Sequence, residues 1–309
     1  VNSTGTSNVA VGAYALDANT TADNNVAIGY TAMTANSTGA QNVALGLAAL
    51  ASNTTADYNT ALGYQTLYTN STGADNTGVG HNALIYNTTG SYNTAVGGLA
   101  LDANTTASNN TAVGYNSLGA NTTGAGNVAV GTYSLDANTT ANNGTAVGYG
   151  ALSANTTAAD NTGIGYLALQ VNTTGASNTA VGSGALDANT TADYNTAVGQ
   201  AALGANTTGT RNVAVGTFAG DACTIGRYNT AIGYGAIGAD VVGDYSVGVG
   251  YQTLQNQASD ADNQAVLNTA VGPFAGNALT TGIKSTFVGA YAGANGTVTG
   301  DENTAVGYN

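Results

Sequence analysis

The stretch NTAVGYNSLGANTTGAG, residues 110–126, is one copy of a seventeen-residue unit that decides the fold. The unit is repeated fourteen times without a gap from Asn8 to Tyr245, and a less regular continuation follows. Its anchor is the pentapeptide Asn-(Thr/Val)-Ala-(Val/Ile/Leu)-Gly, which recurs at seventeen-residue steps. A short fixed period means that one unit cannot bury its own apolar face and must stack on its neighbours. The repeat therefore predicts a solenoid.

Two positions of the unit, numbered from the anchor Asn as position 1, carry large aliphatic side chains. Position 4 is Val, Ile or Leu and position 9 is nearly always Leu, as in Val113 and Leu118. We predict that these two positions form the core, so that an aspartate at either would be costly. Position 3 is small, which predicts a narrow interior. Position 5 is always Gly, which predicts a corner with positive φ or without space for a Cβ.

The local pattern predicts two short strands in each coil, at positions 2–4 and around positions 7–9, joined by Asn-Thr-Thr turns. Helices are not expected, because Gly, Asn, Thr and Ser in every unit oppose them. The predicted fold is an all-β parallel β-solenoid in which each strand pairs with the same strand of the next coil. Asn110 then stacks between Asn93 and Asn127, and these asparagine ladders are expected to satisfy turn polar groups and to face water.

Composition excludes several classes of partner. The 309-residue chain has 6% charged residues, only three Lys and Arg, and a net charge of −13, so nucleic acid and anionic membrane surfaces are not expected to bind. Its 43% hydrophobic content at regular positions indicates order. Cys223 is the single cysteine, which excludes a disulfide framework and a thiolate cluster. The apolar runs are too short to cross a bilayer, so no membrane insertion is expected within this segment.

The chain is expected to form one elongated solenoid with three regions. Residues 1–245 are the regular repeat, 246–267 a coil with a five-residue insertion, and 268–309 irregular terminal coils. The insertion carries Asp260 and Asp262, and a tolerated surface loop is favoured over a recognition loop. Where Leu is lost from position 9, an aromatic at position 7 is predicted to replace its volume; these aromatics are Phe218, Phe274 and Tyr291.

The run Asn-x-Ala-Val-Gly resembles the YadA-like head repeats of trimeric autotransporter adhesins. The longer form NTAVGYxALxANTTG is similar to repeats in phage tail fibres and related fibrous surface proteins. The resemblance implies a left-handed parallel β-roll, a homotrimer around one axis and a role in surface attachment. It also implies an extracellular location, on a cell surface or a virion. A core of two aliphatic side chains per unit is thin, which independently favours side-by-side association.

We therefore expect a non-enzymatic structural fibre, the shaft or head of an adhesin or appendage. Its expected partners are copies of itself and a cell-surface glycan or host receptor. The candidate surface-binding residues are Asp260 and Asp262 of the insertion and tyrosines at position 6, which we expect to be half exposed. Stacking on sugar rings is the functional interpretation, and packing between coils or chains is the favoured one. These tyrosines are Tyr30, Tyr64, Tyr115, Tyr149 and Tyr166.

No catalytic, cofactor-binding or metal-binding residues are expected. His81 and Cys223 are the one possible base and nucleophile, and about eight coils at ~4.8 Å each would separate them. Aspartates recur at position 10 and near position 16, but the Gly-Gly-x-Gly-x-Asp signature of calcium-binding rolls is missing. Turn formation is the better interpretation of these aspartates. Asn-x-Thr/Ser triplets are formal glycosylation acceptors that the turn requires equally.

Two alternatives remain open. Stacked threonine pairs such as Thr122 and Thr123 would suit an ice- or crystal-surface-binding solenoid, although neighbouring Thr residues in a strand face opposite ways and no Thr-x-Thr array recurs. The other alternative is a self-assembling extracellular filament, because neither terminal coil carries a recognisable cap. An excerpt from a longer fibre is favoured over end-to-end assembly.

Whole-unit deletion tests the repeat. Removing Asn93 to Asn109 should leave the fold intact, because each coil needs only its nearest neighbours. Removing about half a unit should be far more damaging, because it moves the core leucine out of register. Thermal melting of the two variants distinguishes these outcomes, and equal tolerance of both deletions would contradict the solenoid.

Overall fold

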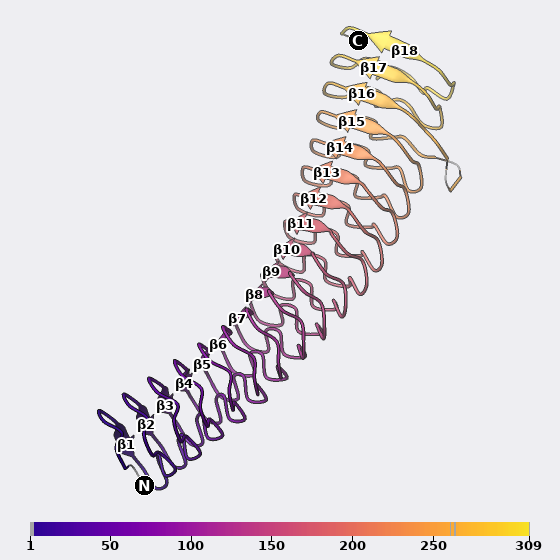
Figure 1. Ribbon diagram of the computed structural model, residues 1–309. Coiled ribbons are helices and arrows are strands. Elements are labelled where there is room, and N and C mark those ends of the chain that lie inside the picture. The colour runs from indigo at the N-terminus through magenta and orange to yellow at the C-terminus, as the bar shows by residue number, and fades with distance from the viewer. Residues whose placement is uncertain (1–2, 260, 263, 309) are drawn as a thin grey trace. The chain divides into compact units, whose positions relative to one another are not determined.

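The computed structural model describes residues 3–259, 261–262 and 264–308. It confirms the all-β parallel solenoid: eighteen three-residue strands recur along the described residues, at the anchor of every unit. The chain divides into two compact units, residues 1–159 and 160–309. Within each unit, the strands lie side by side along one side of the stacked coils (Figure 1). The described part of the chain contains no helix with the length and apolarity needed to cross a bilayer.

Each of the two compact units contains nine of these strands. Those of the first unit, β1 to β9, are Val9–Val11, Val26–Ile28, Val43–Leu45, Thr60–Leu62, Thr77–Val79, Thr94–Val96, Thr111–Val113, Val128–Val130 and Thr145–Val147. Those of the second unit, β10 to β18, are Thr162–Ile164, Thr179–Val181, Thr196–Val198, Val213–Val215, Thr230–Ile232, Val247–Val249, Thr269–Val271, Thr286–Val288 and Thr304–Val306.

Strand pairing follows the sequence repeat. Neighbouring strands in each unit are parallel, and Thr94 pairs with Thr111 as Ala95 pairs with Ala112. The register holds across the insertion, where Val247 pairs with Thr269. Extra residues are therefore accommodated outside the strands, and the aligned strands keep equivalent side chains stacked.

Each coil has one strand and not the two that the alternation predicted. Positions 7–9 form turns, because positions 7 and 9 have left-handed backbone, as in Asn116 (φ 53°) and Leu118 (φ 51°). These turns still bond to neighbouring coils: Leu118 N donates to Ser134 O at 3.0 Å, and Asn116 N donates to Gly98 O at 3.0 Å. Left-handed backbone costs a non-glycine residue roughly 1–2 kcal/mol. The repeated hydrogen bonds and the burial of Leu offset that cost.

The interior lies on the opposite side of the strand from the one predicted. Position 3 points inward, and Ala112 is fully buried, whereas position 4 points outward, and Val96 and Val130 are exposed. Side chains alternate along a strand, so positions 3 and 4 must face opposite ways. The prediction for position 9 is confirmed, because Leu118 is fully buried. The core is therefore built from Ala at positions 3 and 8 and Leu at position 9.

Asparagines at positions 1 and 12 complete the interior. They form the predicted ladders, but the expectation that these ladders face water is wrong, because Asn110 and Asn121 are fully buried. Asn110 N donates to Asn93 Oδ1 at 3.0 Å, and Asn121 Nδ2 donates to Asn104 Oδ1 at 3.2 Å. Both amides also donate to Gly124 O, at 2.9 and 3.0 Å. One turn carbonyl per coil thus joins the two ladders.

Glycine at position 5 is required for both predicted reasons. Gly114 has φ +133°, and a Cβ at this residue would lie 2.7 Å from the carbonyl carbon of Gly131 in the next coil. Such a distance is far below van der Waals contact. The close approach of successive backbones at this corner therefore excludes every other residue.

In coils that lack Leu at position 9, the predicted aromatic at position 7 does not fill the space of the missing side chain. Phe218 and Tyr291 at position 7 are exposed on the surface and do not fill the core. Phe287, the one large residue at position 3, is buried instead. Its ring occupies the space beside Gly276 and Gly293, which stand at position 9. Left-handed backbone at position 7 turns that side chain outward, so an aromatic there cannot replace a core leucine.

The asparagine column at position 12 changes character in the second unit. After Asn206 the position is held by Cys223, Asp240 and Gln257, all buried. Gln257 Nε2 donates to Asp240 Oδ2 and, at 2.9 Å, to Ser246 Oγ. The amide of Gln257 therefore extends the ladder, while Asn206 Oδ1, which faces the cysteine, is buried without a hydrogen-bond partner.

The inserted segment is anchored at both ends. Gln257 and Val266 are buried, Asp244 pairs with Ala265 in a parallel bridge, and Asp262 is exposed. Asp260 lies outside the described residues. Gln257 and Val266, near the two ends of the inserted segment, therefore belong to the interior.

The inverted strand predicts opposite effects for one substitution at two sites. Leu118→Asp should prevent folding or lower Tm steeply, because an unpaired charge is buried, and Leu118→Ala should cost about 2–5 kcal/mol. Val113→Asp should leave the coil folded and lower Tm far less than Leu118→Asp, because position 4 points away from the interior of the coil. Circular dichroism melts compare the variants, and a collapse of Val113→Asp comparable to that of Leu118→Asp would show that position 4 is internal.

The ladders predict a cost for removing one amide. Asn104→Ala should destabilise the fold by about 1–3 kcal/mol, because Ala107 O and the Asn121 amide lose a buried partner. Thr106→Ala, two residues away on the exposed turn, is the control and should change stability by about 0.5 kcal/mol or less. Denaturant unfolding measures both, and equal stability of the two variants would show that the ladder contributes nothing.

Candidate binding surface

The outer face of the strands carries one row of aliphatic side chains. Positions 2 and 4 both point outward from each three-residue strand, so Thr or Val alternates with Val, Ile or Leu. Val96 and Val130 are 36% and 37% exposed, and Val113 between them is partly exposed. Successive strands lie about 4.8 Å apart. Within each compact unit, the row therefore forms a continuous apolar stripe on the surface.

Tyrosines at position 6 form the second exposed feature. The predicted residues are half exposed, from 45% for Tyr115 to 57% for Tyr166. They follow the glycine corner, and some of them meet an aromatic at position 7. Tyr115 and Tyr149 both pack edge-on against Tyr133, with centroids 5.7 and 6.2 Å apart. Tyr30 packs against Tyr14 in the same way. Tyr30, Tyr115 and Tyr149 therefore pack on aromatic neighbours and remain half exposed.

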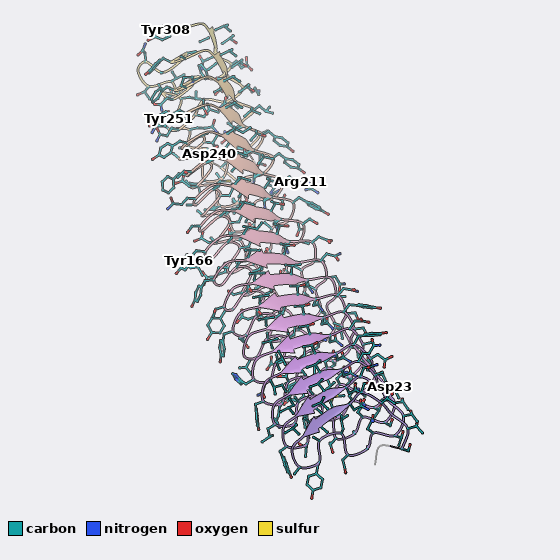
Figure 2. All side chains as sticks on the ribbon, turned by 90° about the vertical axis from the view of Figure 1, so that its left-hand side faces the viewer. Asp23, Tyr166, Arg211, Asp240, Tyr251 and Tyr308 are labelled. Carbon is teal, nitrogen blue, oxygen red and sulfur yellow. The ribbon has the colours of Figure 1, made fainter. Side chains whose placement is uncertain are left out.

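The second unit has an aromatic column of its own, which begins at Phe218. Contacts between ring centroids at 4.9–6.0 Å connect six successive coils. In Figure 2, Tyr166, Tyr251 and Tyr308 project from one side of this unit, and Arg211 projects from the opposite side. The rings of the column are Phe218, Tyr234, Tyr251, Phe274, Tyr291 and Tyr308.

A second aromatic column at position 17 surrounds Arg211. The Arg211 guanidinium lies 5.3 Å from the ring centre of Tyr194 and 5.5 Å from that of Tyr228. Tyr228 stacks on Tyr245 with centroids 4.8 Å apart and planes 2° apart. The pattern analysis missed this column, although the recurrence of Tyr at position 17 was visible. The cation–π contacts give Arg211 a packing role on the surface.

Cys223 and His81 do not form a catalytic pair. His81 is exposed in the first unit, and Cys223 is buried in the second. The pKa of the Cys223 thiol is raised to about 12, mainly by burial and to a smaller extent by the nearby Asp240 carboxylate. The thiol therefore stays protonated at neutral pH and lacks the thiolate that a nucleophile needs.

Aspartates serve the turns, as predicted. At position 16, Asp57 Oδ1 accepts a hydrogen bond from Ala40 N at 2.7 Å, and Asp193 Oδ1 accepts one from Ala176 N at 2.7 Å. In the described residues, no group of three or more His, Cys, Asp or Glu could hold a metal ion. The carboxylates thus cap backbone amides of the preceding coil.

Threonines of the Asn-Thr-Thr turn separate into two kinds. The first points along the coils: Thr122 Oγ1 donates to Thr139 O at 3.0 Å. The second, such as Thr123, is exposed. Within each compact unit, this turn therefore exposes a single row of Thr side chains and not a paired array.

Comparison with known proteins finds no matching family, no matching curated protein and no matching solved structure. The binding surface is therefore defined by the geometry of this chain alone.

Partly buried aspartates at position 10 predict a pH dependence. Burial raises the pKa of Asp102, Asp136 and Asp187 above the ordinary value of 3.8. Their folded forms hold protons that the unfolded chain has released, so their contribution is greatest below pH 3.8 and is lost as pH rises through the raised pKa. Tm should therefore fall as the pH rises from below 3.8 through the raised pKa values.

Asp136→Asn should weaken this fall, because Asp136 Oδ1 is buried without a hydrogen-bond partner. Asp17→Asn makes the same change of charge at an exposed side chain of the same position and serves as the control. Calorimetric melts across this range measure the slope. An Asp136→Asn slope equal to that of the control would contradict the assignment.

Proposed function

We propose that the chain is a non-enzymatic structural fibre, a segment of the shaft or head of an extracellular adhesin or appendage on a cell surface or virion. It acts by presenting side chains at a fixed spacing and not by chemistry. Repetition supports this proposal, because stacked coils extend a surface without creating a catalytic pocket. The buried, protonated Cys223 and the turn-bound aspartates also support it.

One observation carries the proposal: the strand face exposes its aliphatic row. Soluble monomers rarely leave contiguous apolar surface of this kind uncovered, and such surface marks contact with another molecule. The row repeats at every coil, so its natural complement has the same repeat. A second copy of this chain provides that complement.

Lateral association also compensates for the small interior. A regular coil buries one Leu and two small side chains along with two Asn side chains, so the apolar area is modest against the entropy of ordering seventeen residues. Covering position 4 would add one aliphatic side chain per coil. Following the resemblance of the pentapeptide, we propose a left-handed roll that assembles as a homotrimer.

Charged substitutions on the strand face test the assembly. The triple variant Val96→Asp, Val113→Asp and Val130→Asp places charges along the stripe of the first unit. The variant should keep its far-ultraviolet spectrum and sediment as a monomer, whereas the parent should sediment at three times the 30.0 kDa chain mass.

The matched control carries the same three charges on the exposed turn threonines, as Thr106→Asp, Thr123→Asp and Thr140→Asp. This control should remain assembled, because its charges lie away from the strands. A monomeric parent, or a strand-face variant with the parental mass, would refute lateral association through this face.

A further inference from the structure

The aromatic column of the second unit borders a hollow of about 300 Å³. Phe218 and Tyr234 line one part of it, and Asp221, Gln252, Gln255 and Asn256 supply polar groups. This volume is at the lower end of the range for small-molecule pockets. The hollow is therefore sized for one small ligand or one residue of a longer ligand.

Two missing side chains create the hollow. Positions 7 and 10 of one seventeen-residue coil are both Gly, namely Gly235 and Gly238. No other coil in the sequence combines glycine at these two positions. The neighbouring coils carry Phe218 and Asp221 on one side and Gln252 and Gln255 on the other. Because equivalent positions stack, the glycine pair leaves a gap between two rows of larger side chains.

The two rows place complementary hydrogen-bonding groups across the gap. A Cβ at Gly238 would lie 3.6 Å from Asp221 Oδ1 and 3.7 Å from Gln255 Cγ. A Cβ at Gly235 would lie 3.9 Å from Gln255 Nε2. The carboxylate accepts hydrogen bonds and the amide nitrogen donates them. A ligand group in the gap could therefore donate a hydrogen bond to Asp221 and accept one from Gln255.

A neighbouring amide fixes the orientation of Gln255. Asn277 Nδ2 donates to Gln255 Oε1 at 3.3 Å and to Gln252 O at 3.2 Å. Asn277 is itself held by Asn256 Nδ2, which donates to its carbonyl at 2.8 Å. With its oxygen engaged, Gln255 presents its Nε2 protons toward the gap.

The aromatic wall supplies apolar contact. The rings of Phe218 and Tyr234 lie 6.0 Å apart at 87°, and Tyr251 stacks on Tyr234 at 5.4 Å. Phe218 and Tyr234 remain 36% and 45% exposed, so part of each ring is accessible to a ligand. The edge-to-face arrangement holds the rings in place before any ligand arrives.

These features select a hydroxyl-rich, uncharged ligand. Asp221 and the net charge of −13 repel an anion, and a single carboxylate with amides is a weak cation site. An apolar ligand would offer no hydrogen-bond partner to the Gln255 Nε2 protons or to the remaining lone pairs of the Asp221 carboxylate. A sugar ring combines an apolar C–H face for the aromatic rings with hydroxyls that both donate to Asp221 and accept from Gln255.

We propose that this hollow binds one neutral hexopyranose ring of a surface glycan. The inference deepens the proposed function and rests on it for its biological setting, but the hollow itself lies within one chain. Asp221 is the acceptor, Gln255 the donor, and Phe218 with Tyr234 the apolar wall.

Saturation-transfer NMR with methyl glucoside, methyl galactoside and methyl mannoside tests the site. At least one hexoside should receive saturation, and its signal should identify the bound ring face. Gly238→Gln should weaken binding about tenfold or more by filling the gap, since position 10 holds Gln in the neighbouring coil. Gln255→Ala should also weaken it, by removing the donor.

Ser153→Gln is the matched control, because it introduces the same side chain at position 10 of a coil in the first compact unit. Circular dichroism melts check that each variant is folded. Absence of transfer to all three hexosides, or transfer that persists unchanged in Gly238→Gln, would overturn the site.

The strand-face variant separates this inference from the proposed fibre assembly. A monomeric Val96→Asp, Val113→Asp and Val130→Asp chain should still bind the hexoside, because its hollow is intact. Loss of sugar binding with normal assembly overturns only the sugar site, and normal sugar binding by a monomeric parent overturns only the assembly.

Discussion

Hydrogen bonds between buried asparagine amides are the constraint on which each coil depends. The side-chain amides of Asn110 and Asn121 both donate to Gly124 O. To the side-chain oxygen of the equivalent asparagine in the preceding coil, Asn110 donates its backbone N–H and Asn121 its side-chain amide. A buried turn without such partners would leave polar backbone groups unpaired. The ladders therefore close the turn within a coil and fix the stacking between coils. They also explain why a polar residue fills so much of the interior.

Left-handed backbone at positions 7 and 9 makes this compact coil possible. It turns the chain sharply after the glycine corner, so that Leu118 points inward while Asn116 points outward. The strain recurs in every coil and is offset by hydrogen bonds to both neighbouring coils. A coil separated from the stack loses those bonds and keeps the strain, which makes stability a property of the array and not of the single unit.

The surface follows from the same geometry. One side presents the aliphatic row of the strands, and positions 6 and 7 project aromatics from the turn that follows. Because the backbone repeats, variation in side chains alone distinguishes one coil from the next. Gly235 and Gly238 leave a hollow beside the aromatic column, with no change in the path of the chain. Function in such an array is therefore introduced by local substitution on a constant scaffold.

The sequence alone determined the seventeen-residue repeat, the parallel stacking, the glycine corner and the half-exposed tyrosines, because each depends on spacing or on an intrinsic property of one residue type. The tertiary structure decided which side of the strand faces inward. Val113 and Leu118 are equally apolar by pattern, and only the left-handed turn between them places Leu118 inside and Val113 outside. Burial of the asparagines likewise depends on partners that lie a whole coil away. The hollow beside Gly238 was invisible in the sequence, because it requires knowing which side chains of three successive coils lie next to one another.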